Sequence, residues 1–440
     1  MKLLKCAKTV LGISIFCASI FEASATMDCR SMLGAYITPL WDSSNVVGGI
    51  ELTGAIAGMT DRNVKNGLVI AGLGYVFNDS KQQFYVEGGY KNFYNSKGGP
   101  GRKNADSTQG AYESFAKVDK KYWGLREAYY KFNSENLKLT VGLQTMKLPD
   151  YFLLDERVIG VNSAYSSGNF TYSLTAATVM AEFARYADFC GTRHIYNLTR
   201  GGRVDFLGED FGESNFIAAS VKWVNNPEVA PAKESSNSED EFEEFTPIAS
   251  SNSKPFIQEV GAIVYEEFGD VFPDYKYYGG AFAKFNLPLD IDFKTEVLYQ
   301  HVYKEKSIGY YLELNRSFDW SEGYHTLLGA AMLGKAEIDD NTMFYPSYTN
   351  LFMGEVMKMD ALDLPVAQFY LKQNLDLLPS MHFKVQYAKQ LEESKTQELD
   401  LELSAKFFKR LKISTIGGII TSDELKQDTY FGRIEFRLAF

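Results

Sequence analysis

Charged residues recur at every second position along several stretches of this chain, with apolar residues between them. In the last stretch, Thr429 to Phe440, the residues Arg433, Glu435 and Arg437 alternate with apolar neighbours. Successive side chains of a β-strand point to opposite faces, so these three charges would share one face. Cations and carboxylates spaced in this way can line a water-filled path and contact passing solutes.

Fourteen residues on the polar faces of such stretches are candidates for lining a pore. They are Lys138, Gln144, Asp292, Lys294, Glu296, Glu313, Lys372, Lys384, Asp400, Glu402, Lys406, Arg433, Glu435 and Arg437. Seven are cations and six are carboxylates, and this near balance predicts weak ion preference, because selectivity needs a surplus of one charge. Solvation of an aqueous interior is favoured over a ladder of specific substrate contacts. Tyr311 and Tyr370 also lie on polar faces and are candidates for stacking against sugars.

Residues suited to catalysis or metal binding are scarce. Histidine is the usual general base, and the chain has four: His194, His301, His325 and His382. His301 and His325 fall on faces that read as apolar, and His194 lies in a segment of ambiguous pattern. His382 faces the polar side without a Ser or Asp partner at a fixed spacing. No cysteine pair or histidine cluster has zinc spacing. The sequence therefore predicts no enzyme, no metal site and no cofactor.

The elements that would position these residues are alternating runs, separated by short turns such as Ser166-Ser167-Gly168-Asn169. We expect eighteen strands, at about 47–59, 66–77, 82–94, 121–132, 137–146, 156–165, 170–180, 214–224, 256–266, 276–285, 291–303, 308–318, 324–335, 364–375, 381–390, 397–409, 411–421 and 429–440. An even number of alternating strands is typical of a transmembrane antiparallel up-and-down β-barrel, here with about 18 strands and 16–20 possible. The all-β alternative is a secreted array of β-sandwiches.

Composition agrees with a barrel. The chain has 28 Tyr, 32 Phe and 36 Gly, and its mean hydropathy is −0.22. Only alternate residues of a barrel strand face lipid, so such a protein is aromatic-rich yet polar on average. Beyond the first residues no run approaches the roughly 18 apolar residues of a spanning helix.

The amino-terminal residues have the pattern of a secretory signal peptide. Lys2, Lys5 and Lys8 precede an apolar run from Val10 to Phe21, and Ala23-Ser24-Ala25 offers a small-residue cleavage site. We therefore expect a signal peptide at 1–25, a periplasmic leader at 26–46 and a barrel at 47–440. Cys29 and Cys190 would then be the cysteines left, either bridged or unpaired.

The net charge argues against nucleic acid as a partner. The chain carries −11 overall, and the signal peptide contributes +2 through three lysines and Glu22, which leaves about −13. Seven of the 56 acidic residues lie in a low-complexity connection at 225–255, rich in Glu, Ser and Asn. Such composition favours disorder over a calcium site or a docking tail. Counting strands back from Phe440 places this connection on the periplasmic side, with the short turns.

Two resemblances to known proteins accompany these patterns. Phe436, Leu438 and Phe440 resemble the terminal signal of bacterial outer-membrane barrels, which the barrel-insertion machinery reads. The segments Lys138 to Gln144 and Leu153 to Val161 resemble the porin-like family that includes alginate-export channels. Leu143 stands where that motif usually has a basic residue, so the resemblance implies the barrel rather than a charged polysaccharide.

These resemblances imply a porin in the outer membrane of a Gram-negative-type bacterium. The expected function is passive or facilitated diffusion of small hydrophilic solutes, with outer-membrane lipid and the insertion machinery as partners. A structural or adhesive barrel with a plugged lumen and a more specific saccharide channel stay open as alternatives. The oligomeric state and the loop that narrows the pore also stay open.

Overall fold

The described part of the chain is built from β-strands. The computed structural model describes residues 38–39, 45–59, 62–77, 81–95, 118–148, 153–179, 215–225, 255–269, 272–302, 305–321, 324–338, 353–354, 365–375, 381–391, 395–407, 410–423 and 428–440. The signal peptide, Cys29, Cys190, His194 and nearly all of the acidic connection lie outside these ranges. Within them, no helix is long and apolar enough to cross a membrane.

The strands follow one another in order around the sheet. They are β1 (Thr38–Pro39), β2 (Val46–Met59), β3 (Arg62–Phe77), β4 (Gln82–Asn95), β5 (Val118–Asn133), β6 (Leu137–Leu148), β7 (Leu154–Ser167), β8 (Phe170–Val179), β9 (Asn215–Val224), β10 (Ile257–Gly269), β11 (Phe272–Leu287), β12 (Ile291–Val302), β13 (Glu305–Ser321), β14 (Tyr324–Glu337), β15 (Val366–Leu375), β16 (Met381–Gln390), β17 (Gln397–Phe407), β18 (Leu411–Thr421) and β19 (Thr429–Ala439). The short β1 pairs with β2 alone.

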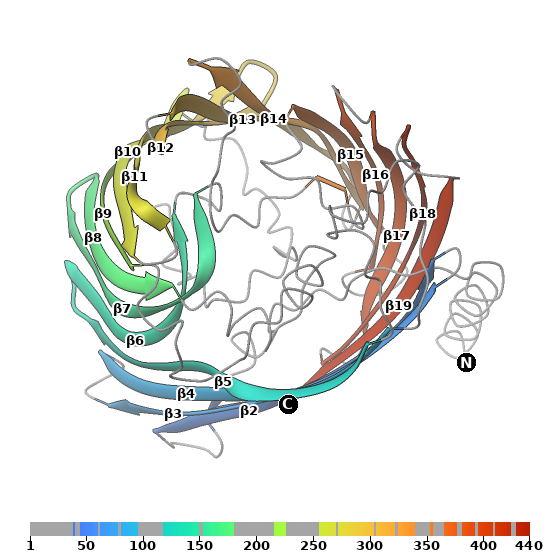
Figure 1. The fold of residues 1–440 in the computed structure, drawn as a ribbon, viewed down its shortest axis with the longest axis horizontal. Coiled ribbons are helices and arrows are strands. Elements are labelled where there is room, and N and C mark those ends of the chain that lie inside the picture. The colour runs from blue at the N-terminus through green and yellow to red at the C-terminus, as the bar shows by residue number, and fades with distance from the viewer. Residues whose placement is uncertain are drawn as a thin grey trace.

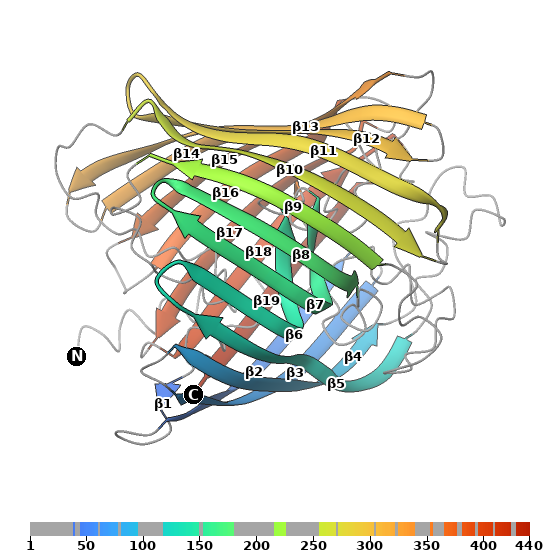
Figure 2. The ribbon, with the colours of Figure 1, turned by 90° about the vertical axis from the view of Figure 1, so that its left-hand side faces the viewer.

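The other strands form a closed antiparallel barrel. Each strand from β2 to β18 pairs with the next, and β19 pairs back with β2, where Arg437 lies opposite Thr53. At the end of this seam, Ile50 and Phe440 exchange two backbone hydrogen bonds of 3.2 and 2.9 Å. Figure 1 shows the ring of strands and Figure 2 their tilt. Each barrel strand is paired on both sides, as a lipid environment requires, although β5 pairs with β6 only from Ala128 to Asn133. The prediction of eighteen barrel strands is confirmed.

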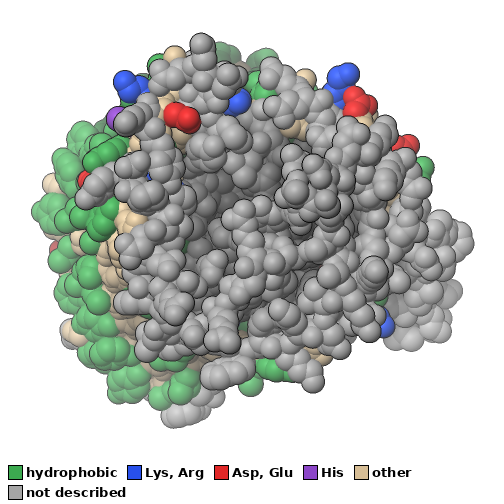
Figure 3. Space-filling view, viewed as in Figure 1, with side chains coloured by type: hydrophobic (Ala, Val, Ile, Leu, Met, Phe, Trp, Pro, Cys, Tyr) green, Lys and Arg blue, Asp and Glu red, His purple; other side chains and the backbone are tan. Residues whose placement is uncertain are grey.

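The outer wall of the barrel is apolar. Ile56, Leu73, Leu174 and Val264 project from different strands and are each more than half exposed. Hydrophobic side chains cover the outer wall at the left of Figure 3, where they form a continuous surface. A soluble protein rarely exposes so much contiguous apolar surface, whereas a membrane barrel presents it to the acyl chains of lipid.

Strand parity places each connection on one of two rims. The rim that carries Phe440 has the short turns 134–136, 168–169, 288–290, 376–380 and 408–410. The opposite rim has the long connections 96–117, 180–214 and 338–365. Both rims have exceptions: the acidic connection between β9 and β10 is long and yet joins its strands at the Phe440 rim, and the connections 60–61, 270–271 and 303–304 are short and lie on the opposite rim. The predicted grouping of connections thus follows from the observed pairing.

Candidate functional site

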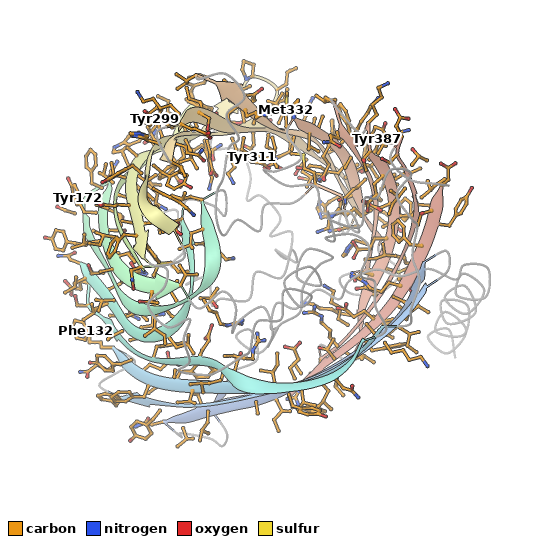
Figure 4. The ribbon with its side chains drawn as sticks, viewed as in Figure 1. Phe132, Tyr172, Tyr299, Tyr311, Met332 and Tyr387 are labelled. Carbon is orange, nitrogen blue, oxygen red and sulfur yellow. The ribbon has the colours of Figure 1, made fainter. Side chains whose placement is uncertain are left out.

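The pairing of the strands defines which side chains point into the barrel. Tyr311 points inward in Figure 4, while Tyr172 and Tyr299 point outward. Residues directly opposite each other on antiparallel strands share a face, so the inner face can be followed from Tyr311 to Glu296, to Phe282 and on around the ring. By this register all fourteen predicted lining residues have an inner-face position. Their contact with solutes stays a prediction.

One apolar face points into the barrel. His325 lies on an apolar face, as expected, but this is the inner face of β14, where its Nδ1 is 2.5 Å from Oδ1 of Asp319. Both faces of β14 are rich in Leu, Ala and Gly, so composition does not distinguish them. His382 is on the inner face as predicted, and its Nε2 lies 3.7 Å from Oε1 of Glu402. The spacing of residues in the sequence did not predict this pair.

The tip of the β6–β7 hairpin turns into the barrel. β5 pairs with β6 only as far as Ala128 opposite Leu143, whereas β6 and β7 stay paired up to Leu148 and Leu154. Figure 1 shows the ends of β6 and β7 in teal inside the ring. Gly142 stands at the point of departure with φ of 122°, and a Cβ there would lie 2.3 Å from the Ala128 carbonyl oxygen. Only glycine fits this bend.

The hairpin tip packs on an apolar part of the inner wall. Leu153, Leu154 and Val158 are almost completely buried. They belong to one hydrophobic cluster, the hairpin cluster, with inner-face residues of β9 to β16. The wall members are Phe216, Ala218, Ile263, Tyr265, Tyr278, Leu298, Val302, Tyr311, Ala331, Leu333, Val366 and Ala388. Burial of this apolar surface holds the tip against one side of the interior and narrows the path on that side.

A second connection also reaches the inner wall. Met353, in the connection between β14 and β15, is buried in the hairpin cluster. The neighbouring Gly354 donates its backbone N–H to Oε1 of Gln368, at 3.0 Å. Its φ is 83°, and a Cβ would lie 2.7 Å from Oε2 of Glu398. The described part of this connection therefore contacts β15 and β17 from within the barrel.

Opposite the hairpin cluster the inner wall is charged. On β19, the Nε of Arg437 lies 2.5 Å from Oε1 of Glu435, and its Nη1 lies 3.9 Å from Oε1 of Glu51 on β2. On β4 and β5, Arg126 binds Glu87 at 2.7 Å. Each of these five side chains is less than 5% exposed. We call the set Arg433, Glu435, Arg437, Glu51, Glu87 and Arg126 the seam network.

Part of the seam network was not predicted, for two different reasons. Glu51 and Thr53 follow the same alternation as the predicted residues, with Ile50 before Glu51 and Leu52 between the two, so this signal was present in the sequence. No pattern in the sequence indicated that Arg126 faces the inside of the barrel. A bulge places Glu87 opposite Glu127 and Gly88 opposite Leu125, so Arg126 is the extra residue and its neighbour Glu127 is also buried.

Several other inner charges form ion pairs, either between neighbouring strands or along one strand. Lys276 lies 3.3 Å from Glu267, Lys294 lies 3.3 Å from Glu296, and Lys284 lies 3.9 Å from Glu259. Tyr311 and Tyr370 both donate their hydroxyls to Glu313, at 2.8 and 2.5 Å. Tyr311 is nearly buried, so little of its ring is left for stacking against a sugar.

The sum of these charges is balanced. Among the side chains that the structure describes, the register adds seven cations and eight carboxylates to the predicted seven and six. The added residues are Arg126, Lys131, Lys222, Lys276, Lys284, Lys335 and Lys412, and Glu51, Glu87, Glu127, Glu259, Glu267, Glu305, Asp319 and Glu398. Such an interior offers charges of both signs, many of them buried, rather than a field of one sign. No group of residues that could hold a metal ion occurs in the described ranges.

Comparison with known proteins supports the architecture. No protein-family model matches this chain, and no curated protein matches it. The crystal structure of OccK5 (OpdH) from Pseudomonas aeruginosa superposes with a TM-score of 0.51 at 10% identity, over 90% of this chain and 98% of that one. The chain shares the fold of OccK5. OprD and the outer membrane protein OpdK, both from Pseudomonas aeruginosa, reach a TM-score of 0.48 at 12% and 10% identity. They match 93% and 90% of this chain and 98% of each of theirs.

Proposed function

We propose that the chain is an outer-membrane channel for passive or facilitated diffusion of small hydrophilic solutes. The observation that carries this proposal is a closed barrel of eighteen strands with an apolar outer wall and a charged inner wall. A barrel of this size encloses room for an aqueous path, which side chains and loops then narrow. Outer-membrane lipid contacts the outer face of the barrel, and the solutes contact its inner face.

The mechanism follows from the inner wall. Solutes move down their gradient through the space between the hairpin cluster and the charged side of the wall. Paired cations and carboxylates replace part of the hydration of a polar solute without retaining one sign of charge. The inward hairpin and Met353 set the width of the path through the barrel. This role needs no cofactor and no catalytic group, and nucleic acid is not a partner.

Membrane orientation follows from the rims. Outer-membrane barrels have short periplasmic turns and longer outer loops, so the Phe440 rim faces the periplasm. We further propose that residues 1–25 direct export, and that Phe436, Leu438 and Phe440 are read by the insertion machinery. Phe436 and Phe440 are about half exposed on the outer wall, which makes them accessible to a partner during assembly.

One alternative has a specific observation in its favour. The seam network is almost entirely buried, and charges that line an open pore would contact water. A structural or adhesive barrel with a plugged lumen fits that burial. Current through single molecules of the purified protein in a planar bilayer separates the two. Steps of defined conductance support the channel, and a silent, correctly folded barrel refutes it. The resemblance to alginate-export channels stays a prediction, as does a more specific saccharide channel.

A further inference from the structure

An arginine lies on the lipid-facing side of the barrel. Arg316 of β13 shares its face with Leu314, which is exposed on the outer wall, and lies opposite Leu328 of β14, also exposed there. Other described charges on this face, such as Lys65 and Glu266, lie close to the rim opposite Phe440. Arg316 instead lies toward the Phe440 rim, next to Asn315, which is opposite Asp292 near the start of β12. A cation in this position is costly in proportion to its depth in the acyl region.

The protein stabilises Arg316 only in part. Its guanidinium carbon lies 4.6 Å from the centre of the Phe318 ring, a cation–π contact. Its Nε is buried and has no hydrogen-bond partner among the described residues. No described carboxylate forms an ion pair with it. Its two terminal nitrogens are not buried and are suited to a phosphate, which a guanidinium can bind through two parallel hydrogen bonds.

A groove on the outer wall begins beside Arg316. It has a volume of about 580 Å³ and is lined chiefly by outer-face side chains of β12 to β16. Leu314, Ala330, Phe369 and Tyr387 form one row across four strands by their register. The small side chain of Ala330 leaves the hollow between the larger residues. Its apolar lining suits an acyl chain rather than a polar group.

Polar groups lie on the other side of Arg316, nearer the Phe440 rim. The exposed Trp320 donates its indole N–H to Oγ1 of Thr326, at 2.8 Å, and Thr326 in turn donates to Gln373. Tryptophan prefers the level of lipid headgroups. The order from this rim toward the membrane centre is therefore indole and amide, then guanidinium, then apolar groove. A phospholipid has the same order of headgroup, phosphate and acyl chain.

We propose that Arg316 and this groove bind one anionic phospholipid of the periplasmic leaflet. The phosphate contacts the guanidinium, and one acyl chain lies along Ala330 and Phe369. The proposal rests on the membrane orientation given above. Lipid A carries phosphates too, but its headgroup belongs to the opposite leaflet, and the groove does not extend from Arg316 in the direction that this would need.

Native mass spectrometry of the full-length protein tests the site. The probes are phosphatidylglycerol, phosphatidylcholine with the same acyl chains, and lipid A, each added to protein released from detergent. We expect wild type to retain one phosphatidylglycerol in preference to the others. Arg316→Ala should retain it at least about tenfold less, since it loses a charge-assisted contact. Ala330→Trp, which fills the groove, should lower retention with Arg316 in place. Lys65→Ala, on the same face near the other rim, is the matched control and should behave as wild type.

Several results would overturn the site. Equal retention by wild type and Arg316→Ala overturns it, as does preference for lipid A or a lipid-free dimer seated on this face. Heat-modifiable migration shows that each variant is folded. Bilayer current separates this proposal from the channel. A conducting wild type that retains no phospholipid overturns the lipid site alone. A silent wild type that retains phosphatidylglycerol refutes the channel and leaves the lipid site supported.

Discussion

Removing the leucines that hold the inward hairpin should widen the channel. Leu153 and Leu154 are nearly completely buried in the hairpin cluster. Replacing one buried Leu by Ala costs about 2–5 kcal/mol, and here the cost falls on the docked position of the tip rather than on the strand ladder. Even 2 kcal/mol changes the ratio of docked to undocked hairpin by about 30-fold. We therefore expect Leu153→Ala with Leu154→Ala to show a larger conductance level in planar bilayers, or more frequent visits to one.

The control removes the same side chain from the other face. Leu174 of β8 is 57% exposed on the outer wall, so Leu174→Ala should leave the conductance unchanged. Thermal unfolding should move little in the double variant, because the closed hydrogen-bonded barrel does not depend on the tip. A double variant with wild-type current and no new level would refute the view that the hairpin sets the width. An increase in both variants would point to a general loosening of the wall.

Four further outcomes are expected. Arg126→Ala leaves Glu87 buried without its partner and should lower the free energy of unfolding in urea by about 3–5 kcal/mol. Lys395→Ala breaks an ion pair with Asp423 whose side chains are more than two-thirds exposed, and it should lower the free energy of unfolding by at most about 1 kcal/mol. Similar losses of stability in Arg126→Ala and Lys395→Ala would contradict the burial of the seam network. The balanced inner charges predict reversal potentials near zero under a salt gradient, and a strongly anion-selective pore would show that the balance is wrong. Deletion of Phe440 removes two hydrogen bonds from the closing seam and should slow assembly, seen as less heat-modifiable barrel on gels; a normal yield would count against the proposed signal. A tag at Ser236 should be hidden from antibody on intact cells and exposed once the outer membrane is opened; labelling of intact cells would reverse the assigned orientation.

Much of the barrel was predictable because each wall residue meets one of two contrasting solvents. The last strand shows this best, since Tyr430 and Phe436 face outward while Arg433 and Arg437 face inward. Strand ends were less accurate. The run predicted at 276–285 is β11 (Phe272–Leu287), because residues near the rims contact water on both faces and the alternation disappears.

The constriction was not predictable from local pattern. β6 and β7 alternate like any barrel strand, and the alternation in Lys138 to Gln144 does not show that pairing with β5 ends at Ala128. Two weak signals existed: a glycine in the middle of the strand, Gly142, and the consecutive leucines Leu153 and Leu154, which a wall with one apolar face does not need. These signals indicate an inward hairpin tip only once the facing inner wall is known to be apolar. That wall is formed by strands about 60 to 250 residues later in the chain.

The two constricting segments have a common origin that bears on how such a channel is tuned. The β6–β7 hairpin tip and the connection containing Met353 both start from the rim opposite Phe440. Short turns on the Phe440 rim, such as 288–290, do not have the length to enter the barrel. Width is therefore set from the outer side by segments that pack on the apolar inner wall, while the seam network closes the barrel on the other side. Changes in Leu153 or Met353 should alter the passage of solutes without altering strand pairing, whereas changes in Arg126 or Arg437 should also lower the stability of the barrel.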